Sequence, residues 1–136
     1  MLAEAAILVV RGWSVLRAQE VAPMLEVEVV RGVPVVTVPT EVDITNAPAL
    51  QAALLEAAAD GSTALVVDMT RTRFCDSAGL RVLMDAHKRA LAEGRAVLLA
   101  VPCAAVLRVL EITGIGQVIP HFASLDEALA HAAETR

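Results

Sequence analysis

The chain has 136 residues, of which 57% are hydrophobic and 2% aromatic, and 11 Lys and Arg stand against 16 Asp and Glu, a formal net charge of −5. This length suits one domain with an aliphatic core, and the apolar content argues against disorder for most of it. The acidic balance and the scarcity of aromatic side chains argue against a nucleic-acid-binding protein, which needs a basic surface or stacking platforms.

The cysteine count and the hydropathy pattern argue against a disulfide-rich, zinc-binding or membrane-spanning protein. Cys75 and Cys103 are the two cysteines, too few for a disulfide framework. The sequence has no CxxC motif and no Cys/His cluster with the spacing of a zinc site. No apolar stretch approaches the roughly 18 residues of a membrane span. We therefore predict no metal or other cofactor, no membrane insertion and a cytoplasmic location.

Residues 1–22 do not fit the pattern of the rest of the chain. Their short apolar run lies between Glu4 and Arg11, so it lacks the basic start and the length of a signal peptide. A flexible leader, an additional helix or strand, and sequence upstream of a true start at Met24 all stay open. We predict an N-terminal leader of uncertain structure over residues 1–22 and one domain over residues 23–136.

The predicted elements alternate strands and helices after an initial hairpin. In chain order they are strands over 25–30 and 33–39, a helix from Thr45 or Asn46 to Asp60, a strand over 63–68, a helix over 77–93, a strand over 96–101, a helix over 102–112, an extended piece over 117–119 and a last helix that opens with the capping box Ser124-x-x-Glu127. Only Arg31 and Gly32 separate the first two strands, so these strands must pair antiparallel. The later alternation of strands and helices predicts an α/β fold with parallel crossovers.

The loop from Arg71 to Gly79 is the segment where we expect function. It joins a buried strand to a helix, and sites in open α/β sheets gather at such junctions. Asp76 is a natural N-cap residue, and Ser77 places a hydroxyl at the helix N-terminus, where a phosphate is tolerated. Gly79, in the first turn, leaves room for close approach. The simpler interpretation, in which Asp76 only caps the helix, stays open.

Two other interpretations of this region lack the residues that they need. CDSAG is one residue short of a GxSxG nucleophile elbow, but His87 lies about 15 Å along the same helix from Ser77, at a rise of about 1.5 Å per residue. Asp68 ends a strand as a phosphoacceptor would, but the first strand ends at Val30-Arg31 without the acidic pair that holds Mg²⁺. Four arginines could pair with a phosphoserine at position 77 or form only a solvated basic surface: Arg71, Arg73, Arg81 and Arg89.

The strings MTRTRFCDSAGLRVLMDAHKRA and GRAVLLAVPCAAVLRVLEITGIGQVIPHFASLDEAL resemble the STAS domain, and more closely the bacterial anti-sigma factor antagonists. EVDITNAPAL, over residues 41–50, is similar to that family's E-x-D…A…L segment. The resemblance runs from about Leu25 to Ala132. It implies a STAS-like α/β fold: a mixed sheet of four to five strands with an antiparallel first hairpin, packed against about four helices.

The resemblance also implies a regulatory protein of transcription and stress response, and not an enzyme. Such an antagonist binds an anti-sigma factor that is also a serine kinase, and thereby releases a sigma factor. The kinase phosphorylates the serine after the Asp of the DS element, here Ser77, which switches binding off, and a separate phosphatase reverses the modification. The implied partner-binding residues are Asp43, Thr45, Asp76, Ser77, Gly79 and Arg81. The alternative is an interaction subunit of a lipid-transport or stressosome-like assembly without a phospho-switch.

Three residues depart from the pattern of the family. Thr40 stands where the family usually has Gly, Cys75 replaces a more usual apolar residue, and Ala78 removes a second hydroxyl that is common there. Ser77 is therefore the only hydroxyl of the DSAG element, and the predicted acceptor is kept.

Overall fold

The computed structural model describes residues 25–134, so the predicted leader lies outside the described residues. The elements are β1 (Val27–Val30), β2 (Val33–Thr37), β3 (Glu41–Val42), α2 (Ala47–Ala58), β4 (Ala64–Asp68), β5 (Phe74–Cys75), α3 (Ser77–Ala92), β6 (Ala96–Ala100), α4 (Ala104–Thr113), the 3-10 helix η1 (Ile115–Gln117), β7 (His121–Phe122) and α5 (Leu125–Glu134). Within this described part, no helix is long and apolar enough to cross a lipid bilayer.

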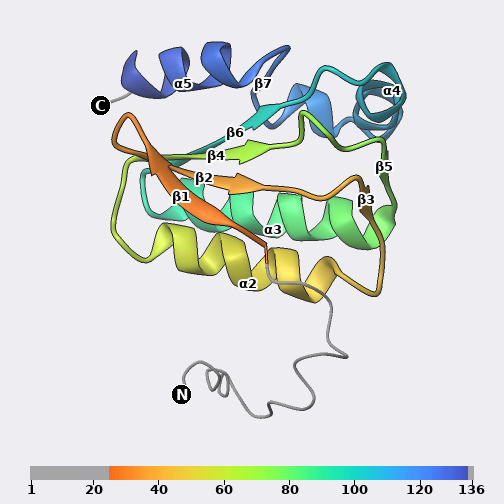
Figure 1. The fold of residues 1–136 in the computed structure, drawn as a ribbon, viewed down its shortest axis with the longest axis horizontal. Coiled ribbons are helices and arrows are strands. Elements are labelled where there is room, and N and C mark those ends of the chain that lie inside the picture. The colour runs from red at the N-terminus through yellow and green to blue at the C-terminus, as the bar shows by residue number, and fades with distance from the viewer. Residues whose placement is uncertain (1–24, 135–136) are drawn as a thin grey trace.

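The main sheet has five strands in the order β1-β2-β4-β6-β7. β1 pairs antiparallel with β2, and the other neighbours are parallel. Arg31 and Gly32 both have positive φ, 53° and 78°, which suits a two-residue hairpin turn. Helices α2 and α3 lie on one face of the sheet and α5 lies on the other (Figure 1). The predicted mixed sheet with its antiparallel hairpin and four helices is confirmed.

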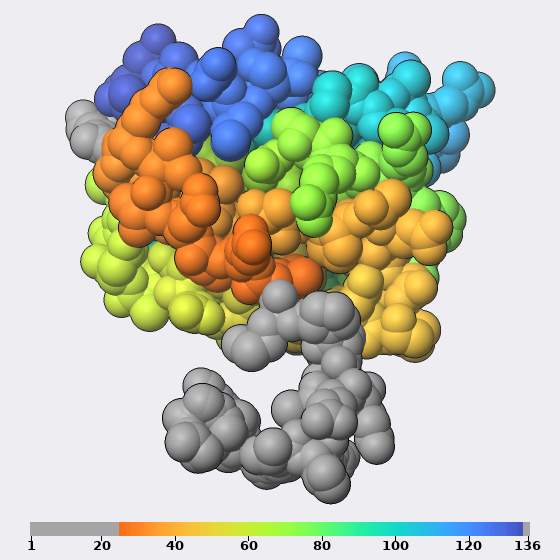
Figure 2. Space-filling view, in the orientation of Figure 1, coloured from red at the N-terminus to blue at the C-terminus, as the bar shows by residue number. Residues whose placement is uncertain are grey.

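The core consists of two aliphatic layers, one on each face of the sheet. In β4, Leu65 and Val67 join the layer under α2 and α3, whereas Ala64 and Val66 join the layer under α5. This division follows from the alternation of side chains along a strand. The tip of the β1–β2 hairpin lies against α5 (Figure 2), where the Arg31 guanidinium pairs with Asp126 at 3.1 Å.

A second sheet of two short parallel strands, β3 and β5, is absent from the sequence prediction. Glu41 pairs with Phe74, and Val42 with Cys75. Each strand has two residues, too few for a periodic pattern. This small ladder ties the segment after β2 to the segment before α3.

The prediction of an extended piece over 117–119 is wrong in its position. Gly114, with φ of 81°, ends α4, and η1 follows directly. The N–H groups of Val118 and Ile119 both donate to the Ile115 carbonyl, at 2.9 Å. Because Ile115 and Ile119 are both buried, the chain turns back on the core here. The last strand begins only at His121.

Two details of the helices also differ from the prediction. Asn46 is the N-cap residue of α2 but makes no capping hydrogen bond with its side chain. That side chain instead accepts from the Asp43 N–H and donates to the Glu41 carbonyl, both at 2.9 Å, and so closes the turn after β3. On α3 the apolar positions of the sequence continue to Leu91, but the buried face ends at His87 and Leu91 is 62% exposed.

Candidate functional site

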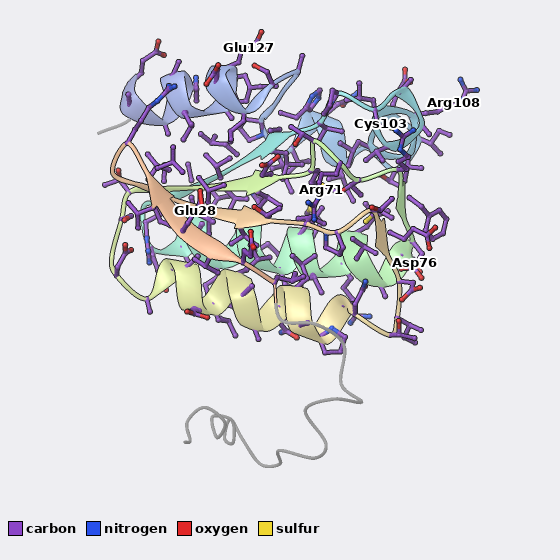
Figure 3. The ribbon with its side chains drawn as sticks, in the orientation of Figure 1. Glu28, Arg71, Asp76, Cys103, Arg108 and Glu127 are labelled. Carbon is purple, nitrogen blue, oxygen red and sulfur yellow. The ribbon has the colours of Figure 1, made fainter. Side chains whose placement is uncertain are left out.

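The candidate site lies at the edge of the main sheet where the parallel strands β2, β4 and β6 end, here called the carboxyl edge. The small β3–β5 ladder and the start of α3 lie at this end of the molecule, on the right in Figure 1. Figure 3 places Asp76 there, at the end of α3 that is far from the tip of the β1–β2 hairpin. The expected junction between a buried strand and a helix is therefore present, with the ladder built into it.

Asp76 fixes the first turn of α3. Its Oδ1 accepts from the N–H groups of Ala78 and Gly79, at 2.9 and 3.2 Å. Its own N–H donates to the Val42 carbonyl at 3.0 Å, which continues the β3–β5 ladder into the helix. The predicted N-cap is confirmed, and Asp76 is held through both its backbone and its side chain.

Ser77 is the first residue of α3 and is exposed. Over residues 25–134, its hydroxyl makes no hydrogen bond to the protein, and the Asp76 cap uses only the Ala78 and Gly79 amides. The structure therefore places a solvent-accessible hydroxyl on a rigid turn, as the sequence predicts.

Gly79 is buried and packs against the β3–β5 ladder. A Cβ atom at this position would lie 2.6 Å from Cγ1 of Val42 and 2.7 Å from Sγ of Cys75. The room for close approach that was predicted at Gly79 is therefore filled by Val42 and Cys75 from inside the protein. Burial, with a smaller effect of the Asp76 charge, raises the pKa of the Cys75 thiol to about 11. Gly79 is a positioning residue that lets α3, and Ser77 with it, sit close to the ladder.

Asp43 and Thr45 form a tight turn directly after β3. The Oδ1 atom of Asp43 accepts from the Thr45 N–H at 2.9 Å and also from the Thr45 hydroxyl. The hydrogen bond from the Thr45 hydroxyl is the largest of several that lower the pKa of the Asp43 carboxyl. Because Val42 pairs with Cys75, this turn lies next to the start of α3.

Of the four candidate arginines, only Arg81 lies close to Ser77, one turn further along α3, and it is exposed. Arg89 lies three turns away, near the other end of the helix. Arg71 lies apart from Asp76, away from the start of α3 (Figure 3). Arg73 faces Cys103 at the start of α4, where the Val106 and Ala105 amides, and more weakly Arg73, lower the pKa of that thiol. Of the four arginines, Arg81 is therefore the one that the helix spacing places beside Ser77.

Two exposed apolar residues beside Ser77 are missing from the sequence prediction. Ile44, between Asp43 and Thr45, is 74% exposed, and Phe74 in β5 is 52% exposed. In β5 the side chains alternate, so burial of Cys75 turns Phe74 outward. An isoleucine enclosed by polar turn residues is the one sequence signal that could have identified Ile44. We call the exposed set Ile44, Phe74 and Ser77 the Ser77 surface.

The enzyme-like interpretations find no support in this geometry. His87 is buried in α3, and His131 stacks on Phe122 with its ring centroid at 5.0 Å. Neither gives Ser77 a general base. Asp68 accepts from the N–H and hydroxyl of Thr70, at 3.0 and 2.7 Å, and so caps its own loop. Across residues 25–134 no cluster of side chains could hold a metal ion.

Comparison with known proteins gives consistent results. Residues 24–128 match the STAS domain. The anti-sigma-F factor antagonist RsfB of Mycobacterium tuberculosis is 31% identical over 100 residues, which are 72% of this chain and 80% of RsfB. The crystal structure of an anti-sigma factor antagonist from Mycobacterium paratuberculosis is 32% identical, with a TM-score of 0.74 over 83% of this chain and 98% of that one. The phosphorylated form of Bacillus SpoIIAA shares the fold, with 22% identity and a TM-score of 0.61 over 79% of this chain and 97% of that one. The chain therefore belongs to the STAS domain family, among the anti-sigma factor antagonists.

Proposed function

We propose that this protein binds an anti-sigma factor through the Ser77 surface, in the cytoplasm, and so releases a sigma factor. It does this as a binding protein and not as an enzyme. The similarity to RsfB, an anti-sigma-F factor antagonist, supports the proposal at the level of the partner. The observation that carries it is the Ser77 hydroxyl, exposed and without a hydrogen bond to any other described residue, on a turn that Asp76 holds rigid.

In this proposal, the anti-sigma factor is also a serine kinase that modifies Ser77. The Ser77 oxygen attacks the γ-phosphorus of ATP, the bond from that phosphorus to the bridging oxygen breaks, and ADP leaves. The hydroxyl proton passes to a base on the kinase. A separate phosphatase hydrolyses the phosphoserine with water and restores the hydroxyl.

The charge of the phosphate explains why one modification is enough. Phosphorylation adds about −1.5 to −2 charges. Buried at an interface without a matching cation, such a charge costs about 2–5 kcal/mol, or roughly thirtyfold to several-thousandfold in affinity. The fold itself tolerates the group because Ser77 is exposed and the Asp76 cap does not involve its hydroxyl. Phosphorylation therefore releases the partner without unfolding the antagonist.

Ile44 and Phe74 supply the apolar part of the contact. Both are large and more than half exposed; Phe74 lies in β5, and Ile44 lies in the turn that directly follows β3. Aromatic and aliphatic anchors at the centre of an interface contribute most of its binding energy. The ladder keeps these anchors and Ser77 in fixed relative positions, so little entropy is lost on binding.

Mapping the phosphorylated residue tests the proposal. The purified full chain is incubated with the anti-sigma factor of the same organism and labelled ATP, and the modified peptide is identified by mass spectrometry. We expect label on Ser77, none on Ser77→Ala, and normal labelling of Ser124→Ala, which removes a serine at the start of α5. Label on another residue, or label that survives Ser77→Ala, would show that the site is misassigned.

A binding measurement separates the proposal from its alternative. The phosphorylated and unmodified chains are titrated against the same partner by calorimetry. The proposal expects at least thirtyfold weaker binding after modification. Equal affinity would instead favour an interaction subunit of a lipid-transport or stressosome-like assembly, in which the contact is constitutive.

A further inference from the structure

We infer, building on the proposed function, that Arg81 is the intramolecular counter-ion of phosphorylated Ser77. The two residues are four positions apart on α3, and both are exposed. Side chains at this spacing share one helix face, with Cβ atoms about 5–6 Å apart. Helical side chains also lean toward the N-terminus, so an arginine at position 81 has the direction and length to reach a phosphate on Ser77.

Three of the backbone N–H groups at the start of α3 are already hydrogen-bonded and are not free to bind a phosphate. The Ala78 and Gly79 amides already donate to Asp76, and the Leu80 N–H donates to the Asp76 carbonyl at 3.0 Å. A phosphate on Ser77 would also lie beside the carboxylate of Asp76 and near that of Asp43. Because these neighbours are negative, the nearby charge that can stabilise the phosphate is a side-chain cation.

Arg81 is available for this role. In the part of the chain that the structure describes, its side chain has no hydrogen bond and no ion pair. Asp85, one turn further on, has the right spacing to pair with it, yet no ion pair forms between them among these residues. A guanidinium also binds two phosphate oxygens at once, which a lysine ammonium does not do with the same geometry.

This pairing gives the modification two consequences at once. Before phosphorylation, the site presents a neutral hydroxyl and a separate cation. Afterwards the phosphate and the guanidinium are drawn together, so the partner meets a changed side chain at both positions. The proposed switch therefore includes Arg81 as a positioning residue for the phosphate.

A titration of the phosphate by phosphorus NMR tests the pairing. Phosphoserine is placed at position 77 of the full chain by genetic encoding, so no kinase is needed. The second ionisation of a free phosphoserine has a pKa of about 6. A nearby guanidinium favours the dianion, so the parent chain should titrate at lower pH than the Arg81→Gln variant. We expect the variant to titrate about 0.15–0.4 pH unit higher, from the usual strength of such helix pairs.

Arg89→Gln is the matched control, since it removes the same charge from an exposed position on the same helix. It lies about 18 Å from Ser77 along the axis, at about 1.5 Å per residue, beyond the screening length at physiological salt. We expect Arg89→Gln to titrate as the parent does, and Arg81→Lys to recover part of the shift. Equal titration of the Arg81→Gln and Arg89→Gln chains would overturn the inference.

The proposed function and the Ser77–Arg81 pairing can be refuted independently of each other. If kinase labelling misses Ser77 but the encoded phosphoserine still shows the Arg81 shift, the proposed function fails and the pairing stands. If labelling succeeds and the shift is absent, the pairing alone is wrong.

Discussion

The two edges of the parallel strands use their polar side chains in opposite ways. At the edge where the strands begin, here called the amino edge, Arg95 donates to the carbonyls of Ser62 and Ala58 and to the Glu93 carboxylate. At the carboxyl edge, carboxylates hold the turns, while the hydroxyl of Ser77 is left exposed. At the amino edge the Arg95 side chain hydrogen-bonds within the protein, whereas at the carboxyl edge the Ser77 hydroxyl has no hydrogen bond to the described residues.

Helix α3 connects these edges and shows the same contrast along its length. Its first turn lies so close to the β3–β5 ladder that only glycine fits at position 79. Its last turn carries Leu91, exposed and outside the core. The first turn thus combines a backbone packed against the ladder with the exposed side chain of Ser77.

The largest effect is expected from a negative charge at position 77. Ser77→Glu should weaken binding of the anti-sigma factor by about 2–5 kcal/mol, because the carboxylate loses its hydration when the partner covers it. Thr63→Glu, an equal charge change at the amino edge, should leave affinity unchanged. Calorimetric titration measures both, and equal losses would remove the functional distinction between the edges.

Gly79→Ala should lower the free energy of unfolding by about 1–3 kcal/mol, because the new methyl overlaps Val42 and Cys75. This loss runs against the usual gain of about 1 kcal/mol when alanine replaces glycine in a helix. Gly116→Ala is the control, since its nearest contact would be an ordinary 3.4 Å from His121. Urea denaturation compares the two, and a stabilised Gly79→Ala chain would contradict the close packing.

Arg95→Met should reduce stability without affecting function. The Ser62 and Ala58 carbonyls lose a charged donor, at a cost of about 1–3 kcal/mol in the free energy of unfolding. Arg108→Met, at an exposed arginine of α4, should have almost no effect. Denaturation gives the stabilities, and calorimetry should show unchanged affinity for the partner. A loss of affinity in the folded Arg95→Met chain would mean that the amino edge also contributes to binding.

Phe74→Ala should weaken the partner complex by about 1–2 kcal/mol, roughly five- to thirtyfold. Leu91→Ala removes an equally exposed apolar side chain at the other end of α3 and should not change the affinity. Both chains should keep the thermal stability of the parent, since both residues lie outside the core. If the two substitutions weaken binding equally, the Ser77 surface is not the contact.

The smallest effect concerns the two cysteines at the carboxyl edge. A raised pKa of about 11 leaves Cys75 roughly one part in a thousand thiolate at pH 8, whereas the pKa of Cys103 is lowered. Iodoacetamide should therefore modify Cys103 first, and the rate at Cys75 should rise with pH as its thiolate forms. Peptide mapping at pH 7 and 9 gives both rates, and faster labelling of Cys75 would contradict its burial.

The sequence by itself determined the features that depend on neighbours in the chain. Arg31-Gly32 between two β-branched runs determines a hairpin, and Asp76 before an amphipathic run determines a helix that starts with an exposed Ser77. Capping and periodicity act within a few residues, so one sequence suffices to predict them.

The tertiary structure alone decided how the site is assembled. The pairing of β3 with β5 joins two-residue segments that are far apart in the chain. It gives Gly79 its packing role, turns Phe74 outward and brings the turn that carries the exposed Ile44 next to the start of α3. Such short strands carry no periodic signal, and they form because the surrounding core brings their backbones within hydrogen-bonding distance. Local sequence thus determines that the Ser77 hydroxyl lies exposed at the start of a helix, and long-range packing determines which side chains surround it.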